Sequence, residues 1–574
     1  MPSYLKSGLP HPGHRRGIAL ALVVISLGIL TVLGVGLLSV AYGARRQAVA
    51  AKGELSAMLA AEGGYEKAVF WMSQQQDMLS SLQQGSPGTS GVLNFPDSSC
   101  TYQVSLFSFV GTRPVFRVSS LGRSGLSERQ VDVFVVQAVS GWDVGTCRIP
   151  CGATETTQVY FVTGETIDMP LQINRADDNP DVRDLSVSGT PSFLQPVAVA
   201  ESRLTQGGSD KYRDILTLFR GGIYFDQPNT RVTDEASVQT KVDRFRASTR
   251  AEYCFTPVGQ APVTRPRSAV QLEFFEEGGA GKVRITNHCT VRGFSQNYDS
   301  RTYDFRIRPG TNGTQYERYD IYTYHMAPVD ADRTGQRRVV PLTDTYVTQS
   351  FNGVQSEPGG QIFINGDVIL GGNADWQAND QVVKGRITVV STGNIWVADS
   401  IVVAGTHDAD GMPAIDNPNV LGLLAQGVIK VVDPGLSTID RSTSLSGFTY
   451  VPVCRPDRSG AREGDRDYNQ RHLPDPTALE AAITVGGGGW GAENVQRGSY
   501  GGRKEADGRQ DYLFVRGSIS EAIRGVVGVT NTDGFLKSYH MDRRLLAGIV
   551  PGDIGLRGKY VPAPSGWHDY RPDR

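Results

Sequence analysis

Residues 17–44, GIALALVVISLGILTVLGVGLLSVAYGA, contain no charged side chain over 28 consecutive positions. Arg15 and Arg16 precede this run, and Arg45 and Arg46 follow it. A helix needs about 20 apolar residues to cross a bilayer, whereas the apolar part of a secretory signal spans about 7–15 residues. The run therefore predicts one membrane-spanning helix near the N-terminus. Because arginines flank both ends, the charge bias is weak; we predict the N-terminus inside and the bulk of the chain outside.

The composition argues against a strongly basic, nucleic-acid-binding surface and favours β-structure. The 574 residues carry a formal net charge of −2, so no overall positive field attracts nucleic acid. Glycine is abundant, with 67 residues, and short β-forming segments lie between glycine-containing turns. The length suits two to four domains. We predict a mainly β chain with one long N-terminal α-helix.

The helical pattern continues beyond the membrane segment. Residues 45–84 are rich in Ala, Leu, Glu, Gln and Met, which are good helix formers. No proline occurs between Ile18 and Gln84, and a breaker cluster follows at 85–88. We predict one nearly continuous helix over residues 18–84, embedded in the membrane at its start and amphipathic afterwards. Three alternating segments then predict a small antiparallel meander, at 101–110, 114–122 and 129–139.

Several of these features together resemble a known family. A short basic leader ends in Gly17, the apolar helix begins Ile18-Ala-Leu-Ala-Leu, and the segment AAEGGYEKA follows at 60–68, before a Tyr-x-Val meander. Over about residues 13–140 the chain resembles the type IV pilin class, in particular the PilX-type minor pilins. The resemblance implies that prepilin peptidase cuts between Gly17 and Ile18. It also implies a single-pass protein of a bacterial inner membrane, with its bulk periplasmic or extracellular.

The chain departs from the family at its fifth mature residue. The family usually has glutamate there, and this sequence has Leu22. In the family that buried carboxylate is thought to pair with the terminal amine of a neighbouring subunit, because a lone charge in an apolar filament core is costly. A subunit with Leu22 resembles tip-initiating minor pilins or pseudopilins. The implied partners are the inner membrane, other minor pilins, the major pilin and the pilus or secretion machinery, with no nucleic acid.

Beyond residue 140 the pattern changes to short apolar strands separated by Gly, Asn or Asp turns. This rhythm predicts an irregular parallel β-solenoid; an ordinary β-sandwich is the alternative. Residues 455–510 are hydrophilic and glycine-rich, which predicts a mostly irregular loop. Such segments lie at 159–167, 171–179, 184–202 and 216–225, and sharper ones at 359–372, 385–405 and 421–434. The predicted division is a leader (1–17), the pilin-like helix (18–84), the meander (85–140), the start of the solenoid (141–239), an inserted aromatic-rich β subdomain (240–355) and the rest of the solenoid with a C-terminal cap (356–574).

The C-terminal part carries a second resemblance, to the end of solenoid domains of uncharacterised function that accompany PilX-type proteins. A Gly-Ser-Ile turn at 517–519 and the residues Arg524, Tyr539, Asp542 and Arg544 match that pattern. We expect them to form a cap. In this cap Asp542 pairs with an arginine such as Arg524, and Tyr539 covers the last apolar layer, so that no strand edge is exposed.

Six cysteines are few for this length, and their even number allows up to three disulfides, with 15 connectivities, in an exported chain. Cys147 and Cys151 are close enough in sequence to pair across a tight loop, and Cys254 and Cys289 across a strand pair. Partly buried free thiols are the alternative. The candidate residues are Cys100, Cys147, Cys151, Cys254, Cys289 and Cys454.

No recognised catalytic motif is present, so we expect no enzymatic activity. Asp367, Asp399 and Asp433 occupy turn positions, where aspartate usually accepts hydrogen bonds from its own backbone. We expect no cofactor, with one alternative. Asp408 and Asp410 precede a glycine turn and Asp416 follows, which suits either a solvated loop or a calcium site.

The sequence therefore predicts a structural protein. We expect a minor pilin or pseudopilin-like subunit that takes part in assembly, initiation or tip capping of a type IV pilus or type II secretion pseudopilus. One alternative is a membrane-anchored surface adhesin or binding module that uses the β-solenoid head, with residues 240–350 as the contact surface. A solenoid hydrolase is a third hypothesis, and it requires carboxylates clustered on one face.

Overall fold

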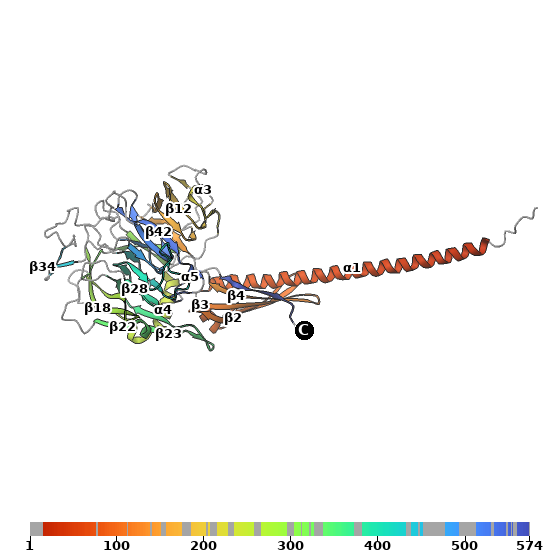
Figure 1. The fold of residues 1–574 in the computed structure, drawn as a ribbon, viewed down its shortest axis with the longest axis horizontal. Coiled ribbons are helices and arrows are strands. Elements are labelled where there is room, and N and C mark those ends of the chain that lie inside the picture. Colours follow the sequence, from red (N-terminus) through yellow and green to blue (C-terminus); the bar gives the residue numbers. More distant parts are fainter. Residues whose placement is uncertain are drawn as a thin grey trace, which may run out of the picture.

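The computed structural model combines one very long helix, a small antiparallel sheet and a large β-rich head (Figure 1). It describes residues 15–75, 78–111, 113–137, 141–150, 156–174, 185–201, 205–206, 215–227, 235–257, 266–294, 303–310, 313–320, 323–326, 337–371, 381–431, 438–445, 448–451, 477–492, 512–529, 533–546, 549–552, 554 and 560–572.

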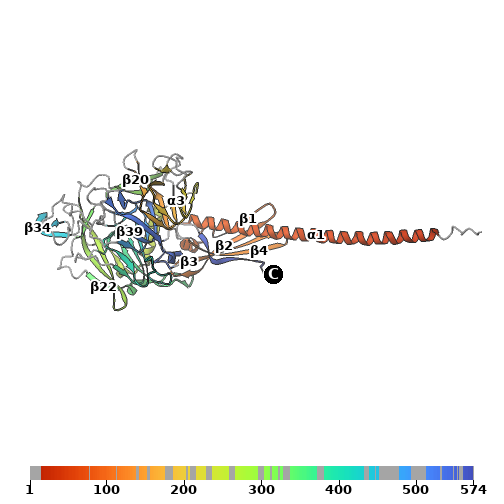
Figure 2. The same cartoon turned by 45° about the horizontal axis from the view of Figure 1, so that its top comes forward.

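The predicted N-terminal helix is present as α1 (Arg15–Gln74), followed by the short α2 (Met78–Gln83). The first half of α1 extends away from the rest of the molecule, and the second half lies along the small sheet (Figures 1 and 2). The chain is thus mainly β with one long N-terminal helix, as the sequence predicts.

The small sheet contains the predicted meander and two further strands. Its order is β1 (Ser90–Asn94), β2 (Ser99–Val110), β3 (Arg113–Ser124), β4 (Ser127–Gln137) and β43 (Tyr560–Tyr570), and all neighbours are antiparallel. The last strand comes from the C-terminal end of the chain, which lies beside the sheet in both views (Figures 1 and 2). We call α1, α2, β1–β4 and β43 the rod.

The helix packs closely onto this sheet through small residues. Ala57, Ala61 and Ala68 are fully buried on the face of α1 that meets the sheet. A Cβ atom at Gly122 in β3 would overlap the Ala57 carbonyl oxygen, so the close approach requires glycine there. Tyr65 completes the contact against Trp567 of β43, with ring centroids 5.0 Å apart.

Long ladders of parallel strands form the head, the described part of residues 141–554. The first ladder contains, in spatial order, β16 (Cys254–Phe255), β26 (Gly359–Ile364), β29 (Arg386–Ser391), β32 (Val420–Ala425), β37 (Ala482–Val485), β39 (Tyr512–Ile523), β5 (Trp142–Thr146), β10 (Leu171–Ile173), β13 (Val197–Val199) and β15 (Ile223–Tyr224). The second contains β28 (Gln381–Val383), β31 (Ile401–Val403), β36 (Thr477–Leu479), β39, β42 (Leu536–Met541), β9 (Thr166–Asp168) and β12 (Ser192–Phe193).

In chain order, each strand of a third ladder comes directly after a strand of the first ladder. It contains β17 (Pro266–Glu277), β27 (Asp367–Leu370), β30 (Ile395–Val397), β33 (Ile429–Val431) and β38 (Trp490–Ala492). A shorter parallel ladder joins β8 (Tyr160–Val162), β11 (Ser186–Ser188) and β14 (Thr205–Gln206).

In the later part of the chain, a complete winding adds one strand to each of the first three ladders. Residues 386–403, for example, supply β29, then β30, then β31. Inward-facing residues such as Val389, Leu423 and Ile483 are almost completely buried and form the continuous apolar core. The parallel pairing within these ladders differs from the antiparallel sheets of the β-sandwich alternative.

The spatial order of the windings differs from their order in the chain. The first half-stack, residues 142–227, begins in the middle, where β5 pairs with β39 and β9 pairs with β42. It runs to one end at β15; the chain then returns to the opposite end, where β16 begins the second half-stack. We call the β39/β5 and β42/β9 pairings the seam.

The structure corrects the predicted insert and places strands within the predicted loop. The proposed insert at 240–355 is not separate from the stack, because β16 and β17 within it pair in parallel with β26 and β27. Its start lies in a helix, α4 (Glu235–Ser248), which contacts β26, β29 and β32. Within the predicted loop at 455–510, residues 477–492 form β36, β37 and β38 of the ladders.

The remaining elements are short or lie at the margins of the stack. The hairpin β17–β18 is extended by β21 and β22. The other helices and strands are β6 (Arg148–Pro150), β7 (Thr156–Gln158), α3 (Ile215–Leu218), η2 (Ala251–Tyr253), β18 (Ala280–Phe294), β19 (Tyr303–Gly310), β20 (Gly313–Asp320), β21 (Thr323–Met326), β22 (Arg337–Pro341), η4 (Leu342–Thr345), β23 (Tyr346–Val347), β24 (Ser350–Phe351), β25 (Val354–Gln355), β34 (Thr438–Leu445), β35 (Phe448–Val451), β40 (Gly528–Val529), β41 (Asp533–Gly534) and α5 (Arg543–Leu546).

Candidate membrane and assembly helix

The first half of α1 presents apolar side chains in all directions. Every large apolar side chain from Ile18 to Tyr42 is 55–73% exposed, and none of the most apolar part of the helix is buried within the chain. Leaving a leucine or valine exposed to water forfeits about 1.5–3 kcal/mol relative to burial. This segment therefore needs cover from outside the chain, from a membrane or from other apolar helices.

Length and composition allow α1 to cross a membrane. The 28 uncharged residues would span about 42 Å as a helix, more than the hydrocarbon core of about 30 Å. Within the described residues, α1 is the single helix that meets these conditions. The hydroxyl of Thr31 donates to the Leu27 carbonyl at 2.7 Å, so this polar group is satisfied inside the helix.

The environment of α1 changes at Arg45 and Arg46, which are both exposed. Beyond them the helix acquires a buried face, from Ala57 to Met72, against β2, β3 and β4. The opposite face still exposes Leu55, Leu59 and Phe70, each by 57–60%. One continuous helix therefore joins an uncovered apolar segment to a packed one.

The predicted leader junction lies inside this helix. Gly17 and Ile18 belong to α1, which begins at Arg15, and residues 1–14 lie outside the described residues. Leu22 is 59% exposed. An apolar side chain thus occupies the position where the family resemblance implies a carboxylate.

The predicted C-terminal cap is not at an end of the stack. Tyr539 is fully buried at the seam, pairs with Ile167 in the ladder, and accepts a hydrogen bond from Trp490 Nε1 at 2.9 Å. Arg524 points into the first half-stack and does not pair with Asp542. The partner of Asp542 is Arg544, at 2.7 Å. The predicted cap is wrong because the windings are not stacked in chain order. The first half-stack lies beside β39 and β42, where the sequence predicted an exposed end.

The described cysteines provide two corrections and leave other pairings as predictions. Cys100 is a buried free thiol, and burial raises its pKa. Cys254 is a half-buried free thiol, so the predicted Cys254–Cys289 disulfide is not formed. Cys147 is buried, whereas Cys151, its predicted partner, and Cys454 lie outside the described residues.

The structure does not gather the predicted calcium ligands into a cluster. Asp408 Oδ1 accepts the backbone N–H groups of Asp410 and Met412 at 3.0 and 2.9 Å, as in a self-contained turn. Among the described residues, no group of three or more His, Cys, Asp or Glu side chains, Asp416 included, could hold a metal ion.

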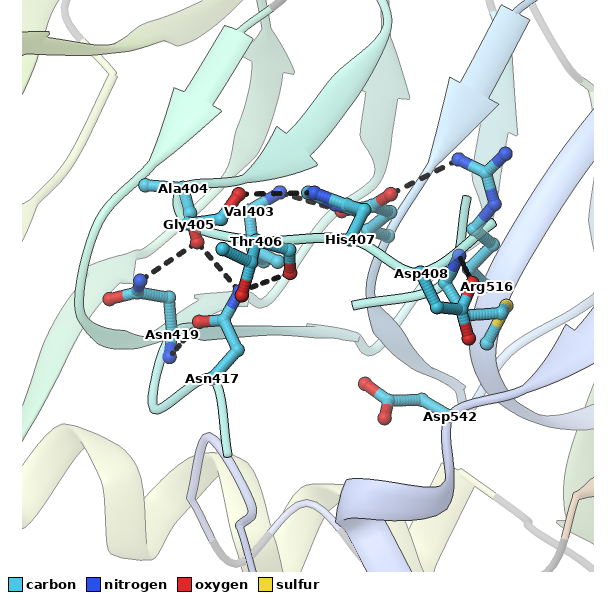
Figure 3. Close-up of polar contacts among 12 residues, drawn as sticks. Val403, Ala404, Gly405, Thr406, His407, Asp408, Asn417, Asn419, Arg516 and Asp542 are labelled. Atoms are coloured by element: carbon cyan, nitrogen blue, oxygen red, sulfur yellow. Dashed lines mark hydrogen bonds and ion pairs between the residues drawn. The ribbon is translucent and has the colours of Figure 1, made fainter. Parts of the chain in front are cut away.

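The neighbouring polar residues also hold the loop in place (Figure 3). Glu480 is almost completely buried and accepts from Val403 N–H at 2.8 Å, from His407 Nε2 at 3.0 Å and from Arg516 Nη1 at 3.1 Å. Of the turn aspartates, Asp367 accepts from the Asn394 N–H at 2.9 Å. These carboxylates are engaged in structural hydrogen bonds.

Apart from Arg524 and Tyr539, the polar residues of the seam were not found from the sequence. Trp142 Nε1 donates to Glu521 Oε1 at 2.8 Å, and Lys537 forms an ion pair with Glu165. Both contacts join residues more than 370 positions apart. No local pattern indicates such partners, because they meet only once the two half-stacks are placed side by side.

Comparisons with known proteins place few constraints on this chain. No protein-family model and no curated protein sequence matches it. Among solved structures, the crystal structure of the competence-associated pilin ComZ from Thermus thermophilus is 12% identical in sequence. That match covers 90% of this chain and 98% of the other, with a TM-score of 0.24. At that TM-score it carries no argument about fold or function.

Proposed function

We propose that the protein is a pilin-like subunit whose apolar helix serves first as a membrane anchor and later as a packing element in a filament. The observation that carries the proposal is the division of α1. Residues 18–44 are uncharged and uncovered, and residues 57–72 are packed on a small antiparallel sheet. A helix used only as an anchor has no need to continue into a folded domain as one rigid element.

The two uses of the helix follow from one requirement. The apolar surface of residues 18–44 is unfavourable in water, so the segment stays in the bilayer until another apolar surface replaces the lipid. Apolar helices of neighbouring subunits provide such a surface. Because the second half of α1 is fixed to β2–β4, the rod leaves the membrane and enters the filament as a unit.

We further propose a position at the start or tip of a type IV pilus or a type II secretion pseudopilus. Leu22 lacks the carboxylate that the family resemblance associates with pairing to a subunit ahead. The head lies beyond the C-terminal end of α1, at the opposite end of the molecule from Ile18 (Figures 1 and 2). A subunit stacked ahead of this one would have to share that space with the head.

The proposed role is structural, without catalysis or a bound cofactor. Buried carboxylates such as Glu480 and Asp367 accept several hydrogen bonds from backbone and side chains, which supports a structural use. The partners proposed are the inner membrane, other minor pilins, the major pilin and the assembly machinery.

The test is the N-terminal sequence of the mature protein, recovered separately from cell membranes and from sheared surface filaments. We expect a start at Ile18 in both fractions, and a Gly17→Val variant that stays uncut and remains in the membrane. A Leu30→Ile variant is the matched control, because it keeps an apolar side chain within the span. A start near Arg45, an uncut chain, or absence from filaments that form normally without the protein would exclude the proposal. The uncut, filament-free outcome would favour a membrane-anchored adhesin.

A further inference from the structure

The C-terminal residues contact the rod and both half-stacks. We call the described residues between 512 and 572 the strap; it contains β39, β42, α5, residues 549–554 and β43. Along its length it passes from the seam, across the second half-stack, to the edge of the rod's sheet. Its contacts can be followed in chain order.

At the seam the strap forms the edge on which the first half-stack is built. The C-terminal part of β39 pairs Ile519 with Trp142, and β42 pairs Tyr539 with Ile167. Without the strap, β5 and β9 would have no strand on that side, and their backbone groups would be left without these partners.

Buried side chains reinforce this edge. Arg524 is completely buried, and its Nη1 donates to the Val159 carbonyl at 2.8 Å. Its guanidinium lies 3.6 Å from the centroid of the Phe161 ring. Lys537 pairs with Glu165, and Trp142 donates to Glu521. Each contact joins the strap to the first half-stack, so the strap fixes both the place and the register of that half.

The middle of the strap is held by the second half-stack. Arg544 donates to the carbonyls of Asn417 and Asn419 at 2.7 and 2.6 Å. The hydroxyls of Thr388 and Thr484 donate to the carbonyls of Pro551 and Ile554 at 2.7 and 3.0 Å. These anchors prevent one end of the strap from moving freely while the other end is bound.

The end of the strap completes the rod. As β43 it adds the fifth strand beside β4. Arg129 pairs with Asp569 at 2.6 Å, and Tyr570 donates to Asp132 at 2.7 Å. In the other direction, Arg113 of β3 donates to the carbonyl of Leu546, the last residue of α5, at 3.3 Å. The rod and the head therefore each contain part of this segment.

We propose that the strap is a closing element that completes the head and the rod in one cooperative step. The first half-stack and the sheet β1–β4 both precede the strap in the chain. Until the strap is in place, β5 and β9 lack their partners β39 and β42, and β4 lacks its partner β43. A chain with an unclosed head would then present an incomplete rod. The strap therefore makes completion of the rod conditional on completion of the head. This inference goes beyond the filament role proposed above and does not depend on it.

The test is native-state hydrogen exchange, measured by mass spectrometry on the full-length protein in detergent micelles. The Arg524→Met variant leaves buried carbonyls without a donor, which we expect to speed exchange in β5 and β10 about tenfold or more. Cooperative closure predicts a similar increase in β4, which Arg524 does not touch. The Trp567→Ala variant removes the contact with Tyr65, and the proposal predicts faster exchange in β4 and also in β5.

A Val368→Ala variant is the matched control, because Val368 is buried in β27, away from the strap. We expect faster exchange around β27 and unchanged exchange in β4. Faster exchange confined to β5 and β10 for Arg524→Met, and to β4 for Trp567→Ala, would overturn the proposal. If Arg524→Met does not fold, the Trp567→Ala result at β5 decides the question alone.

Discussion

The rod and the head join strands in opposite ways. In the rod, β1 to β4 pair antiparallel with their neighbours in sequence, and β43 is the one strand that arrives from far away. In the head, the ladders are parallel, and the two half-stacks meet at strands more than 370 positions apart. Short loops close quickly and cost little entropy, whereas distant pairings must overcome a larger loss. The rod is therefore built mostly from local contacts, and the head depends on a long-range closure.

The two parts also differ in how they pack. The rod relies on a close approach of backbones, at Gly122 and Ala57, with alanines between helix and sheet. The head relies on large apolar side chains in the stack and on buried polar contacts at the seam. We expect the rod to be intolerant of added volume and the head to be sensitive to lost volume and to pH.

The largest effect is expected from Gly122→Val in the rod. The new Cβ would overlap backbone atoms of Ala57 and Ala61, which no change of rotamer can relieve. We expect a loss of about 4 kcal/mol or more in the free energy of unfolding of the rod. Chemical denaturation followed through hydrogen exchange in β2–β4 measures it.

Gly28→Ala is the control for that variant. Gly28 lies in the uncovered half of α1, where an added Cβ would meet open space. Alanine is there expected to leave stability unchanged or to raise it by up to about 1 kcal/mol. Equal effects of the two substitutions would mean that the helix and the sheet are not in close contact.

Leu423→Ala should produce the next largest effect, now in the head. Leu423 is fully buried in the middle of the first ladder, and the stack has little freedom to collapse around the gap. We expect a loss of about 3–4 kcal/mol in the free energy of unfolding of the head. Leu423→Met is the matched control, with an expected loss below about 1.5 kcal/mol. Comparable losses for both would show that packing density does not stabilise this ladder.

The same difference explains which elements were predictable from the sequence. The helix and β2–β4 follow from local signals, namely apolar composition, helix formers and alternation. With α1 and α2 taken together, the predicted bounds lie within a few residues of those observed. The parallel strands of the head were also predictable, for example β29–β31 within 385–405. Their order in space was not, because an apolar alternating strand can pair with many similar strands.

Two missed elements have identifiable reasons. β43 contains Pro562, Pro564 and Gly566, which suit a loop as well as an edge strand. Helix α4 carries Val238, Val242 and Phe245 at helical spacing, and this signal was available in the sequence. The predicted cap failed for the same reason as the strand order, since Arg524 and Tyr539 contact a half-stack that precedes them in the chain by more than 300 positions.

A smaller, pH-dependent effect is expected at the seam. Burial raises the pKa of Glu521 from 4.5 to about 7, against the opposing effect of N–H donors from Trp142, Trp490 and Gly525 and the charge of Arg524. The folded protein therefore keeps this proton at pH values where the unfolded chain has lost it. Stability should fall as the pH rises from about 4.5 to about 7, by at most about 3 kcal/mol, and this contribution should stay constant above.

Glu521→Gln measures that contribution. The other charged or titratable groups near this carboxyl, Lys537, Glu165 and Tyr539, remain in the variant. We expect the wild-type stability to decrease more than that of the variant between pH 4.5 and 7 in urea titrations of the full-length protein. Thr388→Val, which removes an uncharged buried hydrogen bond to Pro551, should lower stability equally at both pH values. Parallel pH curves for wild type and Glu521→Gln would rule out this origin.

The smallest effect is expected where the rod meets water. Lys52 Nζ lies 3.9 Å from Asp97 Oδ2, and both side chains are more than three-quarters exposed. Solvent screens such a pair, and its formation restricts two long side chains, so Lys52→Ala should change the free energy of unfolding by less than about 0.5 kcal/mol. Thermal unfolding at low and high salt measures this, with Asp97→Ala as the partner variant. A loss above about 1 kcal/mol would mean that helix α1 is held to the sheet by surface charge as well as by close packing. The rod and the head would then differ in surface electrostatics as well as in packing.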